Sequence, residues 1–416
     1  MSKPADTTYD LVVFGATSFV GQILTRYLLD TYGLARKVKW AIAGRSRARL
    51  DELKASLGDE ARNLPVVIAD ATDDTQLAAM CEQTRVIIST VGPYALYGEP
   101  LVRACVRSGT DYCDLTGEVQ WIRKMIERYE EEAKSSGARI VHCCGFDSIP
   151  SDMGVWYLQE QAELTFGEPC IHVRMRAKAV KGGLSGGTVA SMINIAREAA
   201  SDPQLRKELS NPFSICPPDH HSETRQPSLS SAQYDDTFGV WLAPFVMGLI
   251  NTRVVHRSNA LQNARYGKEF TYDEAIMTGK GLKGRLAALS MTGGLGVFFA
   301  ASALKPTRWV VEKLVPKPGE GPSPKAQEEG FYDLRFIGRT KDDKVIITRV
   351  TGDRDPGYGS TSKMLGEAGM CLAFDLPADK PGGFWTPSSL LDGSLMERLT
   401  RNAGLRFEIV ETRLHR

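Results

Sequence analysis

A glycine-rich turn near the start of the chain has the residue types and spacing of a phosphate-binding loop. Residues 9–14 are almost continuously apolar, as in a strand buried on both faces, and apolar residues recur at helical spacing after residue 20. Between them, Gly15 permits a tight bend, Ser18 lies where backbone N–H groups approach a pyrophosphate, and Gly21 allows close helix–strand packing. A phosphate would lie at the positive end of the helix. We therefore expect a dinucleotide held by Gly15, Ala16, Thr17, Ser18, Phe19, Val20 and Gly21.

The end of the next expected strand indicates which dinucleotide binds. Residues 38–43 read as a buried strand and run into Gly44-Arg45-Ser46-Arg47. A site for NAD would place Asp or Glu near this end to bind the ribose hydroxyls. The guanidinium of Arg45, with the hydroxyl of Ser46 beside it, can instead stack on the adenine or bind the 2′-phosphate of NADP, and its planar fork suits phosphate geometry. We expect NADPH, and the sequence leaves open whether Ser18, where the common motif has a third glycine, weakens its binding.

Two further strands complete the expected nucleotide site. Residues 65–71 and 85–91 read as the third and fourth buried strands. Ligands of parallel sheets bind at the carboxyl ends of the strands, so the residues there should border the cofactor. The alternation of strands and helices predicts an α/β fold, with a Rossmann-type doubly wound parallel sheet over residues 1–150. The expected contacts are Asp70 and Ala71 at the adenine edge, and Val91, Gly92 and Pro93 at the nicotinamide ribose.

Motifs from residue 92 onward resemble those of one family. They are Gly92-Pro93-Tyr94, Tyr97-Gly98, and the stretches 101–105, 109–118, 144–154, 185–188 and 318–323. With them the chain resembles the saccharopine dehydrogenase-like oxidoreductases over nearly its whole length, and it is similar to their trans-acting enoyl reductase branch. The resemblance implies NADPH-dependent reduction of a carbon–carbon double bond in a polyketide or lipid intermediate, in lipid metabolism such as glycolipid biosynthesis. It also implies that the tail, residues 360–416, completes the Rossmann domain.

This implied reaction has two chemical requirements. Hydride addition to an enoyl β-carbon places negative charge on the carbonyl oxygen, which needs preorganised hydrogen-bond donors; Ser148, Thr188 and backbone amides near Gly145 are the candidates. The α-carbon then needs a proton, from Tyr94, Tyr112 or water. No Tyr-x-x-x-Lys pair follows the fourth strand, so the sequence singles out no acid. The candidate catalytic residues are Tyr94, Ser148 and Thr188.

Residues 151–359 are expected to form a second, α+β domain that faces the substrate. Residues 171–177 alternate as a half-buried strand does, and 331–338 and 344–350 read as a hairpin. Small residues precede a helical run over 189–199, so Ser185 and Thr188 either bind a substrate oxygen or belong to an ordinary loop and cap. In the first domain, Asp114, Thr116 and Glu118 are open to the same two interpretations, capping or ligand binding. A further helix is expected over 362–373.

Two apolar stretches, 241–250 and 289–304, are unusual for this fold. Neither reaches the ~20 apolar residues that span a bilayer. The simpler interpretation is a buried helix at a domain interface. The alternative is an acyl-binding wall or a membrane-touching surface, where the basic residues that follow, Lys305 and Arg308, would meet lipid headgroups.

Two other functions remain open from the sequence. A saccharopine-type reaction, which reduces the imine of an amino acid, would need arginines for several carboxylates, and Arg174, Arg176 and Arg197 are the candidates. The neighbouring apolar stretches argue against so polar a pocket. A non-catalytic lipid-associated protein would keep the fold and the nucleotide only as structure.

Composition narrows the class of protein. The chain has 416 residues, 42% of them hydrophobic, and a formal net charge of +1, which fits two globular domains and argues against a nucleic-acid partner. Its eight cysteines form no C-x-x-C pair, and residues 219–223 read as a solvated loop, so we expect no metal site. The N-terminus lacks the apolar core of a signal peptide, which indicates a cytoplasmic protein. The sequence leaves room for a homodimer and for peripheral contact with the inner face of the plasma membrane.

Overall fold

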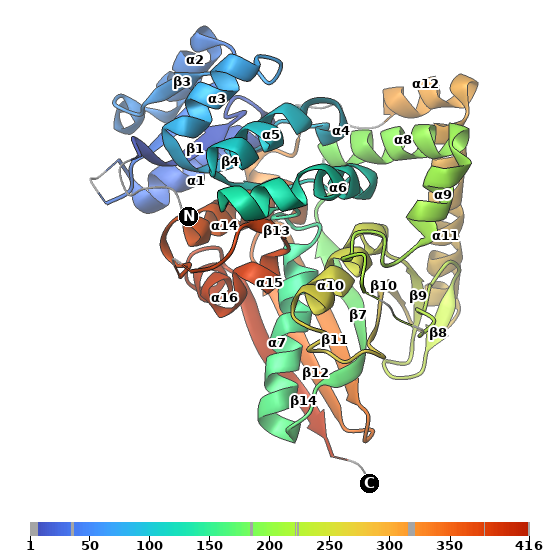
Figure 1. The fold of residues 1–416 in the computed structure, drawn as a ribbon. Coiled ribbons are helices and arrows are strands. Elements are labelled where there is room, and N and C mark those ends of the chain that lie inside the picture. The colour runs from blue at the N-terminus through green and yellow to red at the C-terminus, as the bar shows by residue number, and fades with distance from the viewer. Residues whose placement is uncertain are drawn as a thin grey trace. The chain divides into compact units, whose positions relative to one another are not determined.

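The computed structural model describes residues 7–34, 37–183, 186–220, 222, 224–314, 321–377 and 379–414. The chain divides into two units (Figure 1). The first unit takes residues 1–146, 319–321 and 357–403, and the second takes 147–318, 322–356 and 404–416.

Within the described residues, the first unit is built on a seven-stranded parallel sheet with the order β13-β6-β5-β4-β1-β2-β3. Apart from β13 this is the order of a Rossmann fold, which reverses direction between β1 and β4. The predicted Rossmann-type sheet is therefore confirmed. The strands are β1 (Tyr9–Phe14), β2 (Trp40–Gly44), β3 (Val66–Ile68), β4 (Thr84–Ser89), β5 (Asp111–Asp114), β6 (Arg139–Val141) and β13 (Gly383–Trp385).

The helices of this unit begin and end where local sequence signals predict. Ser18, Ser46 and Asp73 each accept a backbone N–H at the first turn of the helix that follows. Gly109 and Gly137 end helices in the left-handed conformation. The helices are α1 (Phe19–Tyr32), α2 (Arg47–Leu57), α3 (Asp74–Glu82), α4 (Tyr94–Tyr97), α5 (Glu99–Ser108), α6 (Val119–Ser136), α14 (Thr361–Phe374), α15 (Pro387–Leu390) and α16 (Asp392–Arg401), with a 3₁₀ turn at Asp59–Ala61.

The C-terminal helix α14 is part of the core of the first unit. It packs on β1, β4, β5 and α1. The approach is close: a Cβ added at Gly369 would lie 2.4 Å from Cδ1 of Ile88, and one added at Gly366 would lie 3.1 Å from Cδ1 of Leu24. A helix near residues 362–373 was expected, and α14 confirms it.

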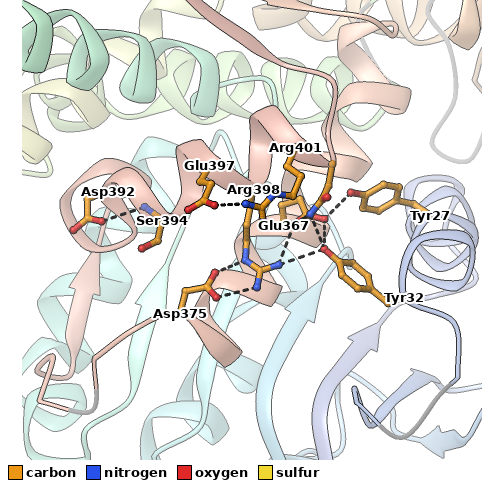
Figure 2. Close-up of polar contacts among 10 residues, drawn as sticks. Tyr27, Tyr32, Glu367, Asp375, Asp392, Ser394, Glu397, Arg398 and Arg401 are labelled. Carbon is orange, nitrogen blue, oxygen red and sulfur yellow. Dashed lines mark hydrogen bonds and ion pairs between the residues drawn. The ribbon is translucent and has the colours of Figure 1, made fainter.

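A buried carboxylate joins α14 to both α1 and α16 (Figure 2). Glu367 is fully buried and accepts hydrogen bonds from the hydroxyls of Tyr27 and Tyr32, each at 2.6 Å. Its second oxygen lies 3.3 Å from Nη1 of Arg398 and 3.1 Å from Nδ2 of Asn402. Arg398 also forms a two-pronged pair with Asp375. The charge of Glu367 is thus compensated by one guanidinium, with neutral donors around it.

The second unit is built on a mixed sheet. Within the described residues its order is β14-β12-β11-β7-β10-β9-β8; β7 and β10 are parallel, and the remaining pairs are antiparallel. The predicted hairpin is confirmed as β11 and β12. The strands are β7 (Cys170–Lys181), β8 (Gln233–Asp235), β9 (Val240–Pro244), β10 (Thr271–Gly279), β11 (Phe331–Thr340), β12 (Val345–Gly352) and β14 (Arg406–Arg413).

The last strand differs from the expectation that residues 360–416 belong to the Rossmann domain. β14 pairs antiparallel with β12 and extends the second sheet. The reason is that β12 would otherwise be an edge strand with unpaired backbone groups, which β14 satisfies. The tail is therefore shared, with α14, β13, α15 and α16 in the first unit and β14 in the second.

Helices α7 and α10 pack against each other and against this sheet, α7 on β7, β11, β12 and β14, and α10 on β10. A Cβ added at Gly154 of α7 would lie 2.3 Å from the ring of Phe336, so only glycine permits this approach. The helices of the unit are α7 (Ile149–Phe166), α8 (Gly186–Ser201), α9 (Pro203–Ser210), α10 (Gly248–Leu261), α11 (Gly281–Ala303), α12 (Lys305–Leu314) and α13 (Pro324–Glu328).

Neither apolar stretch is the buried helix that the simpler interpretation expects. The stretch 241–250 is split between β9, which ends at Pro244, and the start of α10, because proline disfavours a continuous helix. The stretch 289–304 is helical, but it is part of α11, whose most apolar window is only 11% buried. Among the described residues, α11 is the one helix long and apolar enough to cross a membrane, a test that rests on length and composition alone.

The Glu367 cluster predicts a large stability difference between two neighbouring arginines. Arg398→Ala should lower the free energy of unfolding by about 3 kcal/mol, because it leaves the Glu367 carboxylate buried without a cation. Arg401→Ala removes only a surface pair with Glu397 and should cost about 0.5 kcal/mol or less. Urea unfolding of the two variants measures both. Equal losses would contradict the assignment of Arg398 as the cation of a buried pair.

Candidate functional site

The turn between β1 and α1 requires both of its glycines. Gly15 has φ +85°, and a Cβ there would lie 2.6 Å from Cγ2 of Val91. A Cβ at Gly21 would lie 2.3 Å from the carbonyl oxygen of Gly15. Such approaches are too close for any side chain, so both positions require glycine, and the turn leads into the N-terminus of α1. This is the geometry that holds a pyrophosphate in Rossmann folds.

A chain of hydrogen bonds joins this turn to the end of β4. The backbone N–H of Gly21 donates to Oγ of Ser18 at 2.9 Å, and Oγ of Ser18 lies 2.9 Å from Oγ1 of Thr90. Because Oγ1 of Thr90 donates its single proton to the carbonyl of Gly15, at 2.9 Å, Ser18 must be the donor to Thr90. The hydroxyl of Ser18 therefore braces the turn, and a phosphate would be bound by backbone N–H groups. Thr90, which the sequence reasoning missed, directly follows β4.

The residues expected at the 2′-phosphate lie at the end of β2. Arg45 is exposed, and among the residues that the structure describes it has no acidic partner at ion-pair distance. Ser46 caps α2 by accepting the backbone N–H of Arg49. Arg47, in contrast, is paired with Asp51 at 3.0 Å. Arg45 is thus the cation available to a phosphate at this strand end.

Asp70 and Ala71 follow β3 and are half-buried. The Asp70 carboxylate accepts the backbone N–H and the hydroxyl of Thr72, at 2.9 and 2.8 Å. These two bonds lower its pKa, and the charge of Arg45 lowers it further. The Asp70 carboxylate therefore holds the turn after β3 through Thr72.

The segment after β4 turns through a cis peptide between Gly92 and Pro93 into α4. Val91 and Pro93 are half-buried and Gly92 is exposed. Tyr94 is buried: its hydroxyl donates to the carbonyl of Ser89 at 2.9 Å, and burial raises its pKa well above the usual range. This placement supports an anchoring role for Tyr94 rather than proton donation.

Acidic residues near the carboxyl ends of the strands serve mainly as backbone acceptors. Asp114 is buried and accepts the N–H groups of Thr116 and Cys143, the hydroxyl of Tyr112 at 2.9 Å, and lies 2.7 Å from Nδ1 of His142. Glu118 accepts the N–H groups of Tyr94 and Ala95 and so caps α4. The structure thus favours the capping interpretation. Tyr112 is held in the core, where burial raises its pKa well above the usual range.

The loop after β6 is tied to the helix α14. The backbone N–H of Phe146 donates to Oγ1 of Thr361 at 3.0 Å, and a Cβ at Gly145 would lie 3.2 Å from Cγ2 of the same residue. Both contacts lie within the first unit. The motif around residue 145 is therefore positioned by a segment more than two hundred residues later in the chain.

Ser148 and Thr188 lie in the second unit, at the N-terminal ends of two different helices. Ser148 precedes α7, is fully buried and donates to Oδ1 of Asn251 at 3.1 Å. Thr188 is half-buried in the first turn of α8. Ser185 lies outside the described residues. The assignment of Ser148 and Thr188 as oxygen-binding residues stays a prediction.

Asp147, which the sequence reasoning did not single out, is a titratable group of this motif with a pKa shifted toward neutral pH. It directly precedes Ser148, and part of the residue is accessible. Burial of its carboxyl in densely packed protein raises its pKa to about 6, the sole cause of the shift. A carboxyl with that pKa exchanges protons near neutral pH, as a general acid must.

A buried polar network lies behind Ser148. Nδ2 of Asn251 donates to Ser151 at 3.1 Å and to Glu274 at 2.9 Å, and the hydroxyl of Tyr272 donates to Glu274 at 2.7 Å. Burial raises the pKa of Glu274 to about 7, against the effect of these hydrogen bonds. Sequence reasoning could not find this network because its members come from three separate elements, α7, α10 and β10.

A cavity of about 630 Å³ lies on the second unit, beside β7 and β10. Its charged lining includes Arg174, Arg176 and Arg225, but Arg176 is buried and paired with Asp235 and Asp273. Arg197 does not line it and donates to Asn194. The three arginines considered for a polycarboxylate substrate are therefore not gathered in one site. Among the described residues no cluster of His, Cys, Asp or Glu could hold a metal.

Comparison with known proteins follows this geometry. The saccharopine dehydrogenase NADP binding domain family matches residues 11–141. A protein of Mycobacterium tuberculosis (strain ATCC 25618 / H37Rv) named as a trans-acting enoyl reductase is 40% identical over 406 residues, which are 94% of this chain and 95% of the relative. This chain belongs to the trans-acting enoyl reductase family. A trans-acting enoyl reductase of Mycobacterium ulcerans (strain Agy99) is 36% identical, with 99% of each chain covered.

The fold is shared with a solved structure of a different branch. Saccharopine dehydrogenase (L-Glu forming) from Saccharomyces cerevisiae superposes with a TM-score of 0.54 at 12% identity, covering 96% of this chain and 99% of that chain. This likeness concerns the fold alone. The NADP-binding family match and the relatives show an NADP-dependent oxidoreductase, and the glycine cradle with the free guanidinium of Arg45 fits that cofactor.

The buried network predicts a pH-dependent stability. The pKa of Glu274 is raised from 4.5 to about 7 in the folded chain. Protonation of Glu274 therefore adds to the free energy of unfolding in full below pH 4.5, and this stabilisation is lost as pH rises through 7. Glu274→Gln, which mimics the neutral acid, should stabilise the protein at pH 8 by up to about 3 kcal/mol and change little at pH 4.5. Melting temperatures of both proteins across this range measure the difference. Parallel profiles would contradict a proton-binding Glu274.

Proposed function

We propose that this enzyme reduces the carbon–carbon double bond of an α,β-unsaturated thioester or ketone in a lipid- or polyketide-like intermediate, as in glycolipid biosynthesis. The observation that carries the proposal is the similarity to trans-acting enoyl reductases over almost the whole chain, including the second unit. The family match to an NADP-binding domain alone would be compatible with many reductions.

The first unit would hold NADPH, which supplies a hydride when bound. Backbone N–H groups of the turn at residues 15–21 would bind the pyrophosphate, and Arg45 would bind the 2′-phosphate. The segment Val91–Pro93 would border the nicotinamide ribose, because it leaves β4 at the point where the strand order reverses. These residues orient the cofactor and take no part in bond making.

The substrate needs a stabilised oxygen and a proton. Ser148 donates its proton to Asn251, so backbone N–H groups near Gly145 are better candidates than Ser148 for binding an enolate oxygen. For the α-carbon we assign Asp147 as the proton donor in place of Tyr94 or Tyr112. Its support is a pKa of about 6, whereas both tyrosines are buried and hydrogen-bonded in the core.

The proposal places the enzyme in the cytoplasm, in peripheral contact with the inner face of the plasma membrane. All eight cysteines, each within the described ranges, are free thiols, as a reducing compartment would keep them. The alternative is that a second copy of the chain covers the exposed apolar surface of the second unit and forms a homodimer.

Arg45 should determine the preference for the phosphorylated cofactor. Arg45→Ala is expected to weaken NADPH binding roughly tenfold to a hundredfold and to leave NADH binding within about threefold, because only NADPH carries the 2′-phosphate. Arg47→Ala is the matched control, since its guanidinium is paired with Asp51. Titration of cofactor fluorescence measures all four affinities. An equal loss for both cofactors would remove Arg45 from the phosphate site.

Asp147→Asn tests the proton donor and the reaction. With 2-enoyl thioesters or α,β-unsaturated ketones of increasing chain length, wild-type turnover should fall as pH rises through about 6, because the donor must be protonated. The variant should lose about a hundredfold in kcat and also lose this pH dependence, while NADPH affinity stays unchanged. Unchanged turnover would point to water as the donor. Absence of NADPH oxidation with every enoyl substrate would overturn the proposed function.

A further inference from the structure

Helix α11 presents large apolar side chains to solvent. Leu282, Leu286, Leu289 and Val297, with Leu304 at the C-terminal end, are between 50% and 70% exposed. Single exposed leucines are ordinary, but a contiguous row of them marks an interaction surface.

These side chains form one stripe. At 3.6 residues per turn, positions 282, 286, 289, 297 and 304 fall within about a quarter of the helix circumference. The positions between them on that face are small and uncharged: Gly293, Gly296 and Ala300. The apolar stripe, defined by these eight residues, therefore runs the length of α11 without interruption by a charge.

The other side of α11 is packed on the second unit. The helix contacts β9, β10 and α8, and Ala288 is fully buried. A Cβ at Gly284 would lie 2.2 Å from the carbonyl oxygen of Gly279, which holds the start of the helix against the end of β10. A helix fixed along one side cannot be surrounded by lipid, so α11 suits the surface of a membrane rather than a span across it.

Positive charge flanks the stripe at both ends. No acidic residue occurs in the sequence between Glu274 and Glu312, whereas Lys280, Lys283 and Arg285 lie at the start of α11 and Arg308 follows it. Lys280, Lys283 and Arg285 are exposed. This charge distribution complements an anionic lipid surface.

The next helix, α12, adds an aromatic side chain of the kind found at membrane interfaces. Trp309 is 60% exposed and Val310 45% exposed. The ammonium of Lys313 lies 3.7 Å from the centre of the Trp309 ring. An exposed tryptophan with a cation beside it matches the depth of lipid headgroups, where indole rings are enriched.

We infer that α11 and α12 form a docking surface for an anionic phospholipid bilayer, with the apolar stripe among the acyl chains and the flanking basic residues among the headgroups. This surface is a property of the second unit and does not depend on the reductase activity. A protein bound at this surface would meet a lipid-like substrate that is already dissolved in the same membrane.

Vesicle co-sedimentation tests the surface directly. Vesicles of phosphatidylcholine with about a quarter phosphatidylglycerol are compared with vesicles of phosphatidylcholine alone. Wild-type protein should bind the anionic vesicles more tightly, and the difference should shrink as salt is raised. The double substitution Leu286→Glu with Val297→Glu should weaken binding at least about tenfold.

A matched control separates the stripe from net charge. Leu164→Glu with Leu414→Glu changes two other exposed leucines, 77% and 71% exposed, by the same charge, and should bind like wild type. NADPH binding by both double variants verifies folding, and a failure of enoyl reduction leaves this outcome untouched.

Three outcomes would overturn the inference. Wild-type protein does not sediment with anionic vesicles, or the stripe variant binds as tightly as wild type. Alternatively, wild type is a dimer in light scattering and the stripe variant a monomer, with no vesicle binding by either. The last result would assign the stripe to a second copy of the chain.

Discussion

The cofactor site of the first unit depends on one bridge between two strand ends. The N–H of Gly21, the hydroxyls of Ser18 and Thr90 and the carbonyl of Gly15 form a continuous donor–acceptor chain across the point where the strand order reverses. These hydrogen bonds hold the turn after β1 against the residue after β4, at the N-terminus of α1 where the proposed pyrophosphate would bind. The serine that stands in place of the third glycine of the common motif is hydrogen-bonded to Thr90, the residue that follows β4.

Both units use buried polar groups for positioning. In the first unit Glu367 joins α14 and α16 to α1, which lies more than three hundred residues earlier in the chain. Asp114 and Glu118 hold the loops at the carboxyl edge of the sheet. In the second unit Glu274 lies among Asn251, Tyr272 and Ser151, and no cation pairs with it in the part of the chain that the structure describes. The two carboxylates differ in whether a cation lies beside them. Glu367 is paired with the guanidinium of Arg398, whereas burial has the largest effect at Glu274 and raises its pKa.

The family relation and the site geometry constrain different parts of the function. Relatives at 36–40% identity extend across both units, so the second unit is shared with enoyl reductases and not only the nucleotide fold. In the proposed site, the exposed Arg45, which has no ion-pair partner among the described residues, would bind the 2′-phosphate of the cofactor. Both tyrosines considered as the acid are hydrogen-bonded in the core, whereas burial raises the pKa of Asp147 to about 6, and for that reason Asp147 is the acid that we propose.

Local sequence was sufficient for features that depend on neighbouring residues. The strands and helices of the nucleotide half, the glycine turn, the hairpin of β11 and β12 and the helix α14 follow from periodicity and caps, which act within a few residues. Other features required the tertiary structure, because burial and hydrogen-bond partners come from distant segments. Ser18 stabilises the turn because its hydroxyl is hydrogen-bonded to Thr90, and Tyr94 is fixed in place because its hydroxyl donates to the carbonyl of Ser89. For the same reason α11 is exposed although its composition resembles that of a core helix, and β14 joins the second sheet. Exposure of a helix face and pairing of an edge strand both depend on a neighbouring segment, and sequence periodicity does not identify that segment.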